Sequence, residues 1–211
     1  MDSRYPALII GAGPAGLATS RELSRRGIRH LVLERGPAPG FCWSAAYDSL
    51  RLHTGKHLST LPGLRFQRGT PIFPARDDFV RYLREYARKF DLPVEFNAEV
   101  TAVTRNGGWN VRTASGRWSA QTLVFATGIM SNPVLPTWPG RDTFLGTVMH
   151  SVEYLRPAPF RGRRVLVVGV GNSGGEIASD LAHAGVDVSI AVRSGANVVP
   201  RELAGVPIQY L

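Results

Sequence analysis

Two glycine-rich loops, each set between a short apolar run and a helical pattern, constrain the fold of this chain most strongly. The first, G-A-G-P-A-G at residues 11–16, follows the apolar run 7–10. The second, G-V-G-N-S-G at residues 169–174, follows the apolar run 165–168. A strand that leads through such a loop into a helix begins a parallel βαβ unit. The sequence therefore predicts an α/β fold that contains two such units.

Each glycine of the first loop has its own task. Gly11 makes the turn, Gly13 leaves room for a pyrophosphate against the backbone, and Gly16 lets helix and strand pack closely. The positive end of the helix dipole then faces the phosphates. Glu34 follows the apolar run 30–33, where a carboxylate can accept hydrogen bonds from ribose hydroxyls. The first unit is predicted to bind a dinucleotide, and a glycine turn without a ligand is the alternative.

The second unit differs from the first at the end of its second strand. We expect its strands at residues 165–168 and 188–192 and its helix at 176–184, with Arg193 ending the second strand. A carboxylate there would repel a 2′-phosphate, whereas a guanidinium can bind it bidentately. Arg193 therefore favours NADP(H) over NAD(H), with a solvated arginine as the alternative. Two dinucleotide sites suggest electron transfer between two cofactors, and the familiar partner of NADPH is FAD.

The part of the chain between the two units carries further patterns. Residues 36–75 are rich in Gly, Pro, Trp and His, have little periodicity and are predicted to form a functional loop. Residues 77–90 have helical spacing. Short alternating segments with a hairpin turn at Asn106, Gly107 and Gly108 predict a small antiparallel β meander. These segments are residues 94–96, 100–104, 109–113 and 117–119.

A buried-strand pattern at residues 122–125 ends in Ala126, Thr127 and Gly128, and a proline-rich linker follows. These patterns predict two Rossmann-like dinucleotide-binding units. The patterns place a boundary near residues 130–160, and the family resemblance described below implies the bounds 1–140 for the N-terminal part of an FAD-binding domain, 141–162 for a linker and 163–211 for the start of an NADP(H)-binding domain. The second unit is expected to be incomplete.

Composition excludes several other classes of protein. A single cysteine, Cys42, cannot form an intramolecular disulfide, a CxxC redox pair or a cysteine-rich zinc site, so we expect a cytoplasmic protein without a metal. The net charge is +9, but all basic residues except Lys56 and Lys89 are arginine, and no nucleic-acid partner is expected. No apolar run reaches the roughly 18 residues of a membrane span, so no membrane partner is expected.

Several segments together resemble class B flavin-dependent monooxygenases. They include both glycine loops, Glu34-Arg35, the Ala126-Thr127-Gly128 turn and the segment 144–154. This last segment meets the pattern F-x-G-x-x-x-H-x-x-x-(F/Y), which is far more specific than either glycine loop. Within the class, residues 47–56 and 199–202 look like segments of the YUCCA-like, indole-3-pyruvate type.

The resemblance implies an FAD- and NADPH-dependent monooxygenase. NADPH would reduce FAD, and the reduced flavin would react with O2 to a C4a-hydroperoxide that transfers one oxygen atom to a small organic substrate, for which the YUCCA type suggests a 2-oxo acid. One alternative is a non-oxygenating pyridine-nucleotide flavin oxidoreductase, whose usual cysteine pair is absent here. The other is a nucleotide-binding module without turnover.

The resemblance also assigns site residues. His53 and Lys56 are the predicted catalytic residues, and His53 stands where many relatives carry an asparagine beside the flavin. We expect Trp43 to lie against FAD, Val100 to offer backbone contacts to adenine and His150 to position NADPH. Ordinary loop or core roles are the alternatives. The predicted cofactor-binding residues are Gly11, Gly13, Pro14, Ala15, Gly16, Glu34, Arg35, Trp43, His53, Val100, Ala126, Thr127, Gly128, His150, Gly169, Gly171, Asn172, Ser173, Gly174 and Arg193.

Members of this class are longer than 211 residues, and no Gly-Asp segment that would hold the flavin's ribityl chain follows Arg193. The sequence is therefore expected to be either a fragment of a monooxygenase or a natural short protein. Unpaired strand edges lead us to expect self-association or a complementary C-terminal fragment as a partner.

Overall fold

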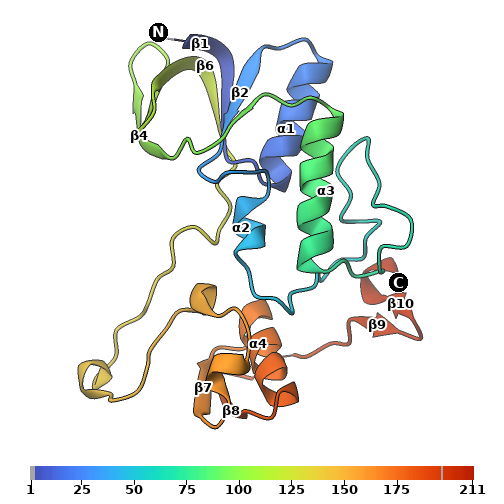
Figure 1. The fold of residues 1–211 in the computed structure, drawn as a ribbon, viewed down its shortest axis with the longest axis vertical. Coiled ribbons are helices and arrows are strands. Elements are labelled where there is room, and N and C mark those ends of the chain that lie inside the picture. Colours follow the sequence, from blue (N-terminus) through green and yellow to red (C-terminus); the bar gives the residue numbers. More distant parts are fainter. Residues whose placement is uncertain (1–2, 196) are drawn as a thin grey trace.

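The structure is a computed structural model that describes residues 3–195 and 197–211. Figure 1 shows two lobes joined by a long linker, with the N-terminus in the upper lobe. The upper lobe is built around a six-stranded sheet, and the lower lobe contains a two-stranded sheet packed on one helix. Both sheets combine with helices, so the predicted α/β fold is confirmed.

The sheet of the upper lobe has the strand order β3-β2-β1-β6-β5-β4. Its strands are β1 (Ser3–Ile10), β2 (His30–Leu33), β3 (Val94–Glu95), β4 (Val100–Arg105), β5 (Trp109–Thr113) and β6 (Arg117–Phe125). β3, β2, β1 and β6 run parallel to their neighbours, whereas β6, β5 and β4 pair antiparallel. The parallel part is the one that leads into the first glycine loop.

Helices cover one face of this sheet. They are α1 (Pro14–Arg25), the short α2 (Phe41–Ser44) and α3 (Arg76–Lys89), and Figure 1 shows α1 and α3 side by side. Phe79, Leu83 and Tyr86 of α3 are buried against Leu17 of α1 and the sheet. The Asp78 carboxylate accepts a hydrogen bond from the Ala75 amide at 3.2 Å, which satisfies one of the free N–H groups at the start of α3.

The lower lobe consists of β7 (Arg164–Val168), α4 (Asn172–His183) and β8 (Asp187–Ala191). β7 and β8 pair in parallel. Ile177 and Leu181 of α4 form a small core, which two tyrosines, Tyr47 and Tyr154, complete. Tyr47 comes from the loop after α2, so this core joins the two lobes.

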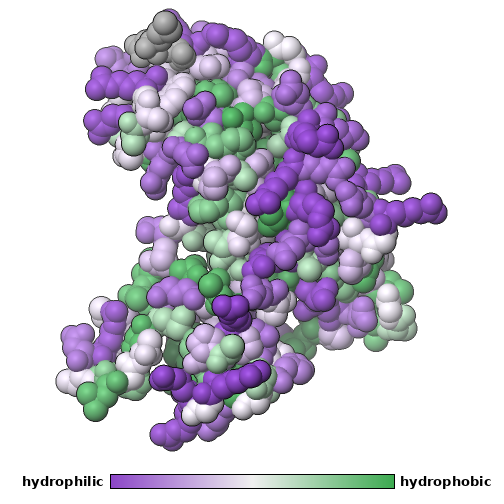
Figure 2. Space-filling view, viewed as in Figure 1, coloured by the Kyte–Doolittle hydropathy of each residue, from purple (hydrophilic) through white to green (hydrophobic). Residues whose placement is uncertain are grey.

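The linker and the C-terminal segment contain short elements. These are the 3-10 helices η1 (Arg141–Thr143), η2 (Ser151–Glu153), η3 (Ala158–Phe160) and η4 (Ile208–Tyr210), and the hairpin of β9 (Glu202–Leu203) and β10 (Val206–Pro207). Leu145 in the linker and Val134 in the segment before it are exposed, and Figure 2 shows hydrophobic residues on the surface of this region. Among the described residues, no helix is long and apolar enough to span a membrane.

The predicted meander needs a correction. The hairpin turn at 106–108 is confirmed, because the Asn106 amide donates to the Gly108 carbonyl between β4 and β5. Residues 94–95, however, pair in parallel with β2. The chain reaches β3 by crossing over through α3, and a crossover of this kind returns a strand in parallel. Residues 117–119 and 122–125 belong to one strand, because β6 pairs with both β5 and β1.

Three further boundaries differ from expectation. Helix α4 begins at Asn172, so the last residues of the second glycine loop form its first turn. The segment 36–75 contains α2 and an isolated bridge between Arg51 and Ala75. The C-terminal hairpin had no strand signal of useful length. Its turn at Ala204 and Gly205 has positive φ at both positions, as tight hairpin turns require.

Candidate functional site

The first glycine loop is tightly packed against protein at Gly11 and Gly16 and open at the middle glycine, Gly13. A Cβ on Gly16 would lie 1.9 Å from the Gly11 carbonyl oxygen, and Gly11 itself has a φ of +104°. Around Gly13, no atom of the described residues comes within 4 Å of a Cβ position. The loop therefore has the closed and open positions that a bound pyrophosphate requires.

Glu34 lies directly beneath this loop. Its buried carboxylate accepts hydrogen bonds from the amides of Ala12, at 2.6 Å, and Gly36, at 2.9 Å. The predicted ribose contact is compatible with this arrangement, since each carboxylate oxygen has two lone pairs. Glu34 thus also has a structural role, because it ties the glycine loop to the end of β2.

The Ala126-Thr127-Gly128 turn meets the same loop. The Ala126 amide donates to the Ile10 carbonyl at 2.9 Å, and the Ala126 carbonyl oxygen lies 2.5 Å from a Cβ position on Gly11. Residues that are far apart in sequence therefore meet at the carboxyl ends of β1 and β6. Val100, at the start of β4, packs against the buried Leu8 cluster.

The second glycine loop repeats the geometry of the first at its second and third glycines, whereas among the described residues its first glycine, Gly169, has open space where Gly11 packs against Ala126. A Cβ on Gly174 would lie 2.2 Å from the Gly169 carbonyl oxygen, while around Gly171 the described residues leave more than 4 Å of open space. The Gly169 amide donates to the Ala191 carbonyl at 2.8 Å, as the Gly11 amide donates to the Leu33 carbonyl at 2.8 Å. Both loops are thus fixed to the second strand of their unit by the same bond.

This equivalence corrects the position expected for Arg193. Since Ala191 corresponds to Leu33, the counterpart of Glu34 is Val192, and Arg193 lies one residue further along. β8 ends at Ala191, two residues before Arg193. The carboxylate is still absent from the second unit, and the exposed Arg193 side chain lies just beyond the strand end.

The two predicted catalytic residues lie in the loop after α2, and each has a protein partner. The Lys56 ammonium donates to the Thr70 carbonyl at 2.5 Å. The Nε2 atom of His53 lies 3.0 Å from the Glu176 carboxylate on α4. His53 therefore contacts the second unit, whereas Lys56 forms its hydrogen bond within its own loop.

Sequence reasoning missed Glu176, whose carboxylate is the centre of a cluster with Tyr47, His53 and Arg201. The Tyr47 hydroxyl donates to its carboxylate at 2.5 Å, and the Arg201 guanidinium lies at 3.2 Å. Burial, together with this hydrogen bond to Glu176, raises the pKa of Tyr47 well above its usual value. A usable signal existed: an acidic residue two positions after Gly174, in a helix expected to face phosphates, needs donors of its own.

His150 is engaged locally. Its Nδ1 atom accepts a hydrogen bond from the Val152 amide at 3.2 Å, and its own amide donates to the Glu153 carboxylate at 2.8 Å. The last residue of the same motif, Tyr154, is buried and donates to Asp180 on α4 at 2.6 Å. Burial and this bond raise the pKa of Tyr154. The motif therefore packs the linker against the second unit.

Trp43, Arg35 and Cys42 lie around α2. The Trp43 ring packs edge-on against Phe79, with ring centroids 4.7 Å apart, and joins the edge of the core. The Arg35 guanidinium lies 3.2 Å from the Cys42 sulfur. Cys42 is half-buried, so it is less enclosed than a core residue.

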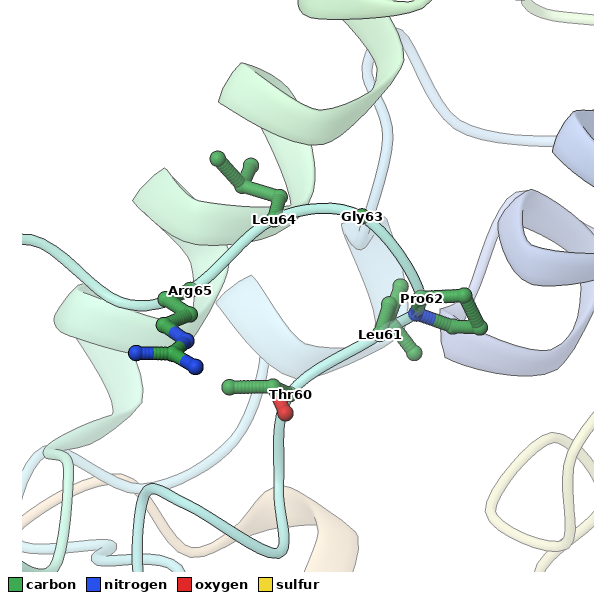
Figure 3. Close-up of a pocket in the computed structure, with 6 residues that line it drawn as sticks. All are labelled: Thr60, Leu61, Pro62, Gly63, Leu64 and Arg65. Carbon is green, nitrogen blue, oxygen red and sulfur yellow. The ribbon is translucent and has the colours of Figure 1, made fainter.

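A hollow of about 510 Å³ lies away from all of these residues, beside the loop that runs along α3. It is lined by Thr60, Leu61, Pro62, Gly63, Leu64 and Arg65, and Figure 3 shows Thr60 and Arg65 facing one another at one end. The Tyr82 hydroxyl accepts from the Leu61 amide at 2.6 Å and donates to the Leu64 carbonyl at 2.9 Å. None of the lining residues belongs to the predicted site.

Comparison with known proteins identifies the family to which this arrangement belongs. Residues 8–201 match the family described as pyridine nucleotide-disulphide oxidoreductase. The chain is 42% identical over 205 residues to the probable indole-3-pyruvate monooxygenase YUCCA1 of Arabidopsis thaliana, an alignment that covers 94% of this chain and 50% of the relative. The chain thus spans about half the length of the curated relatives it matches.

Solved structures agree. A mutant flavin monooxygenase from Stenotrophomonas maltophilia matches with a TM-score of 0.90 and 30% identity, over 96% of this chain and 61% of that one. A structure of OTEMO in complex with FAD and NADP matches with a TM-score of 0.69 and 26% identity, over 87% of this chain and 38% of that one. The predicted resemblance to YUCCA-like flavin monooxygenases is confirmed, and the chain belongs to the pyridine nucleotide-disulphide oxidoreductase family.

Proposed function

We propose that this chain forms the FAD-binding and NADP(H)-binding parts of a flavin-dependent monooxygenase. The observation that carries the proposal is the shared geometry of the two glycine loops: each has a positive φ at its first glycine, is closed at its third and is open at the middle one, Gly13 or Gly171. The proposed division is 1–140 for the FAD part, 141–162 for the linker and 163–211 for the NADP(H) part. The separate sheets of the two lobes support this division.

FAD fits the first loop. The open side of Gly13 accepts a pyrophosphate, and the free N–H groups at the start of α1 face it. The turn at 126–128 flanks the loop, and Glu34 lies beneath it. The complex of OTEMO with FAD and NADP supports the choice of both cofactors.

NADP(H) fits the second loop for the same reasons. Gly171 is open, α4 begins immediately after it, and Val192 stands where the first unit has Glu34. A 2′-phosphate therefore meets no carboxylate at that position, and the exposed guanidinium of Arg193 is one residue away. This arrangement supports NADPH over NADH.

When bound, FAD would take a hydride from NADPH and pass its electrons to O2, with one oxygen atom going to a small organic substrate. The chain's own residues bind and orient the two cofactors and exclude water. Exclusion matters because water promotes the release of hydrogen peroxide in place of oxygen transfer to the substrate. His53 and Lys56 are proposed to act beside the flavin. A 2-oxo acid is the proposed substrate class, supported by the indole-3-pyruvate monooxygenase relatives.

A non-oxygenating flavin oxidoreductase is the second candidate, because the family itself is described by pyridine nucleotide and disulphide chemistry. The chain has one cysteine, so the cysteine pair of a disulfide reductase cannot form within it. For this candidate, the remaining reactions are diaphorase-like reduction and the reduction of quinones. The single, unpaired Cys42 also supports a reducing, cytoplasmic setting.

The test uses the purified chain reconstituted with FAD. We expect a yellow protein whose flavin absorbance is bleached by NADPH under argon. In air, with a 2-oxo acid added as substrate, NADPH oxidation should yield an oxygenated product of that acid. Bleaching without oxygenated product would favour the second candidate. A protein that binds nucleotides without bleaching would be a binding module, and one that binds neither cofactor would contradict the proposal.

A further inference from the structure

The carboxylate of Glu176 joins three segments of the chain. Tyr47 donates to its Oε2 atom at 2.5 Å, and the side chains of His53 and Arg201 approach its Oε1 atom at 3.0 Å and 3.2 Å. Glu176 itself belongs to α4, two residues after Gly174 of the second glycine loop. One carboxylate therefore connects the loop after α2 and the C-terminal hairpin segment to the helix that starts at the second loop.

This carboxylate is well enclosed. The Glu176 side chain is 16% exposed and the Tyr47 residue is 6% exposed. A charge removed from water to this extent needs hydrogen-bond donors and an opposite charge, and Glu176 has both. Its position is thus fixed by the groups around it, and it can in turn fix them.

The contact favours one position for the hydrogen on the His53 ring. An ionised carboxylate carries no hydrogen, so its oxygen, 3.0 Å from the Nε2 atom, favours a hydrogen on that nitrogen. In a neutral imidazole, Nδ1 then has no hydrogen and acts as an acceptor. His53 would therefore accept a hydrogen bond from an N–H or O–H group of flavin or substrate.

We propose that Glu176 is a positioning residue that holds His53 in its Nε2–H tautomer and links its orientation to the helix of the second glycine loop. The tautomer is argued from the contact between the two side chains, whereas the link to coenzyme binding rests on the proposed function. Asp180, one turn further along α4, provides a matched control, because it accepts a hydrogen bond from Tyr154 at 2.6 Å, whereas the carboxylate next to His53 is that of Glu176.

The tautomer is measured on the ¹⁵N-labelled chain by long-range ¹H–¹⁵N spectra at about pH 8.5, well above the usual histidine pKa of about 6.5. His53→Gln assigns the signals. We expect Nε2–H in the wild type, a mixture of tautomers in Glu176→Ala and recovery of Nε2–H in Glu176→Gln, whose amide oxygen still accepts. Asp180→Ala should match the wild type.

An Nδ1–H tautomer in the wild type would overturn the proposal, even where Glu176→Ala fails to fold. An unchanged tautomer in a folded Glu176→Ala variant would do the same. The link is tested by adding NADPH: the His53 signals should shift in the wild type and shift much less in Glu176→Ala. If NADPH does not bind at all, the proposed function is wrong while the tautomer result stands. If it binds and the shift persists in the variant, the link is wrong.

Discussion

The Glu34 carboxylate accepts a hydrogen bond of 2.6 Å from the Ala12 amide inside the first glycine loop, and its other oxygen accepts from the Gly36 amide. Both amides are buried with it. The carboxylate therefore stabilises the loop before any ligand arrives, and its loss should be visible in the stability of the protein without cofactor.

Glu34→Gln is expected to destabilise the chain by about 1–3 kcal/mol, the cost of leaving one buried N–H group without an acceptor. A glutamine has one acceptor oxygen, so its NH2 group would face one of the two amides. Urea unfolding measures the change. Glu95→Gln, at an exposed position in β3, is the control and should lie within about 0.5 kcal/mol of the wild type. Equal stability of Glu34→Gln and the control would contradict this role.

The last and the middle glycine of the first loop should respond differently to one methyl group. Gly16→Ala places its Cβ 1.9 Å from a backbone oxygen and should cost roughly 3 kcal/mol or more. Gly13→Ala meets open space and should leave the free energy of unfolding within about 1 kcal/mol of the wild type. It should nevertheless abolish FAD binding, because the methyl group occupies the proposed pyrophosphate position.

Circular dichroism and flavin absorbance separate these effects. A folded Gly13→Ala variant that retains stoichiometric flavin would show that the pyrophosphate lies elsewhere. Gly171→Ala provides the same comparison for the second loop: it should weaken NADPH binding and leave the yellow colour unchanged.

Arg193→Ala is expected to weaken NADPH binding by about 1–3 kcal/mol, or roughly tenfold to a hundredfold, because a charge-assisted hydrogen bond to the 2′-phosphate is lost. NADH binding should be nearly unchanged, since NADH lacks that phosphate. Titration of the apparent constants for both coenzymes provides the measurement. Arg161→Ala, an exposed arginine in the linker, controls for the general loss of positive charge. Equal effects on both coenzymes would show that Arg193 does not read the 2′-phosphate.

The sequence predicted the parts of this site that depend on local backbone geometry. Both glycine loops, the strands before them and the turn at 126–128 follow from short patterns, because only glycine fits a positive φ or a close backbone approach. The Glu176 cluster could not be predicted in this way. Its members, such as Tyr47 and Arg201, come together through packing between lobes, which no local pattern records. The same reason explains why β3 was assigned to the wrong kind of pairing.

Buried tyrosines should make the fold sensitive to alkali. Burial raises the pKa of Tyr86 to about 12. In the unfolded chain this hydroxyl ionises near pH 10, so between these two pH values the unfolded state loses a proton that the folded state keeps. The free energy of unfolding should therefore be unaffected by Tyr86 below about pH 10 and fall above it.

Tyr86→Phe should make this fall shallower by up to about 1.4 kcal/mol per pH unit, the contribution of one proton. The variant also loses the hydrogen bond from the hydroxyl to the Pro62 carbonyl, which lowers stability at neutral pH as well. The comparison is thus made on the slope against pH from urea unfolding between pH 9 and 12, and parallel curves for both proteins would contradict the assignment.

The last prediction concerns the lower lobe. One face of the β7–β8 sheet packs on α4, but on the other face Leu166 is 62% exposed and Val168 is 78% exposed. In the described residues β7 and β8 pair only with each other, which leaves strand edges open beside an apolar surface.

We expect the 211-residue chain to associate with itself through this face as its concentration rises. Light scattering should show the association, and Val168→Lys should reduce it, because a charge cannot be buried there without a partner. Leu58→Lys, at a position that is 58% exposed in the loop after α2, should leave it unchanged. A monodisperse monomer at all concentrations, or equal effects of the two substitutions, would show that this face is not the one that associates.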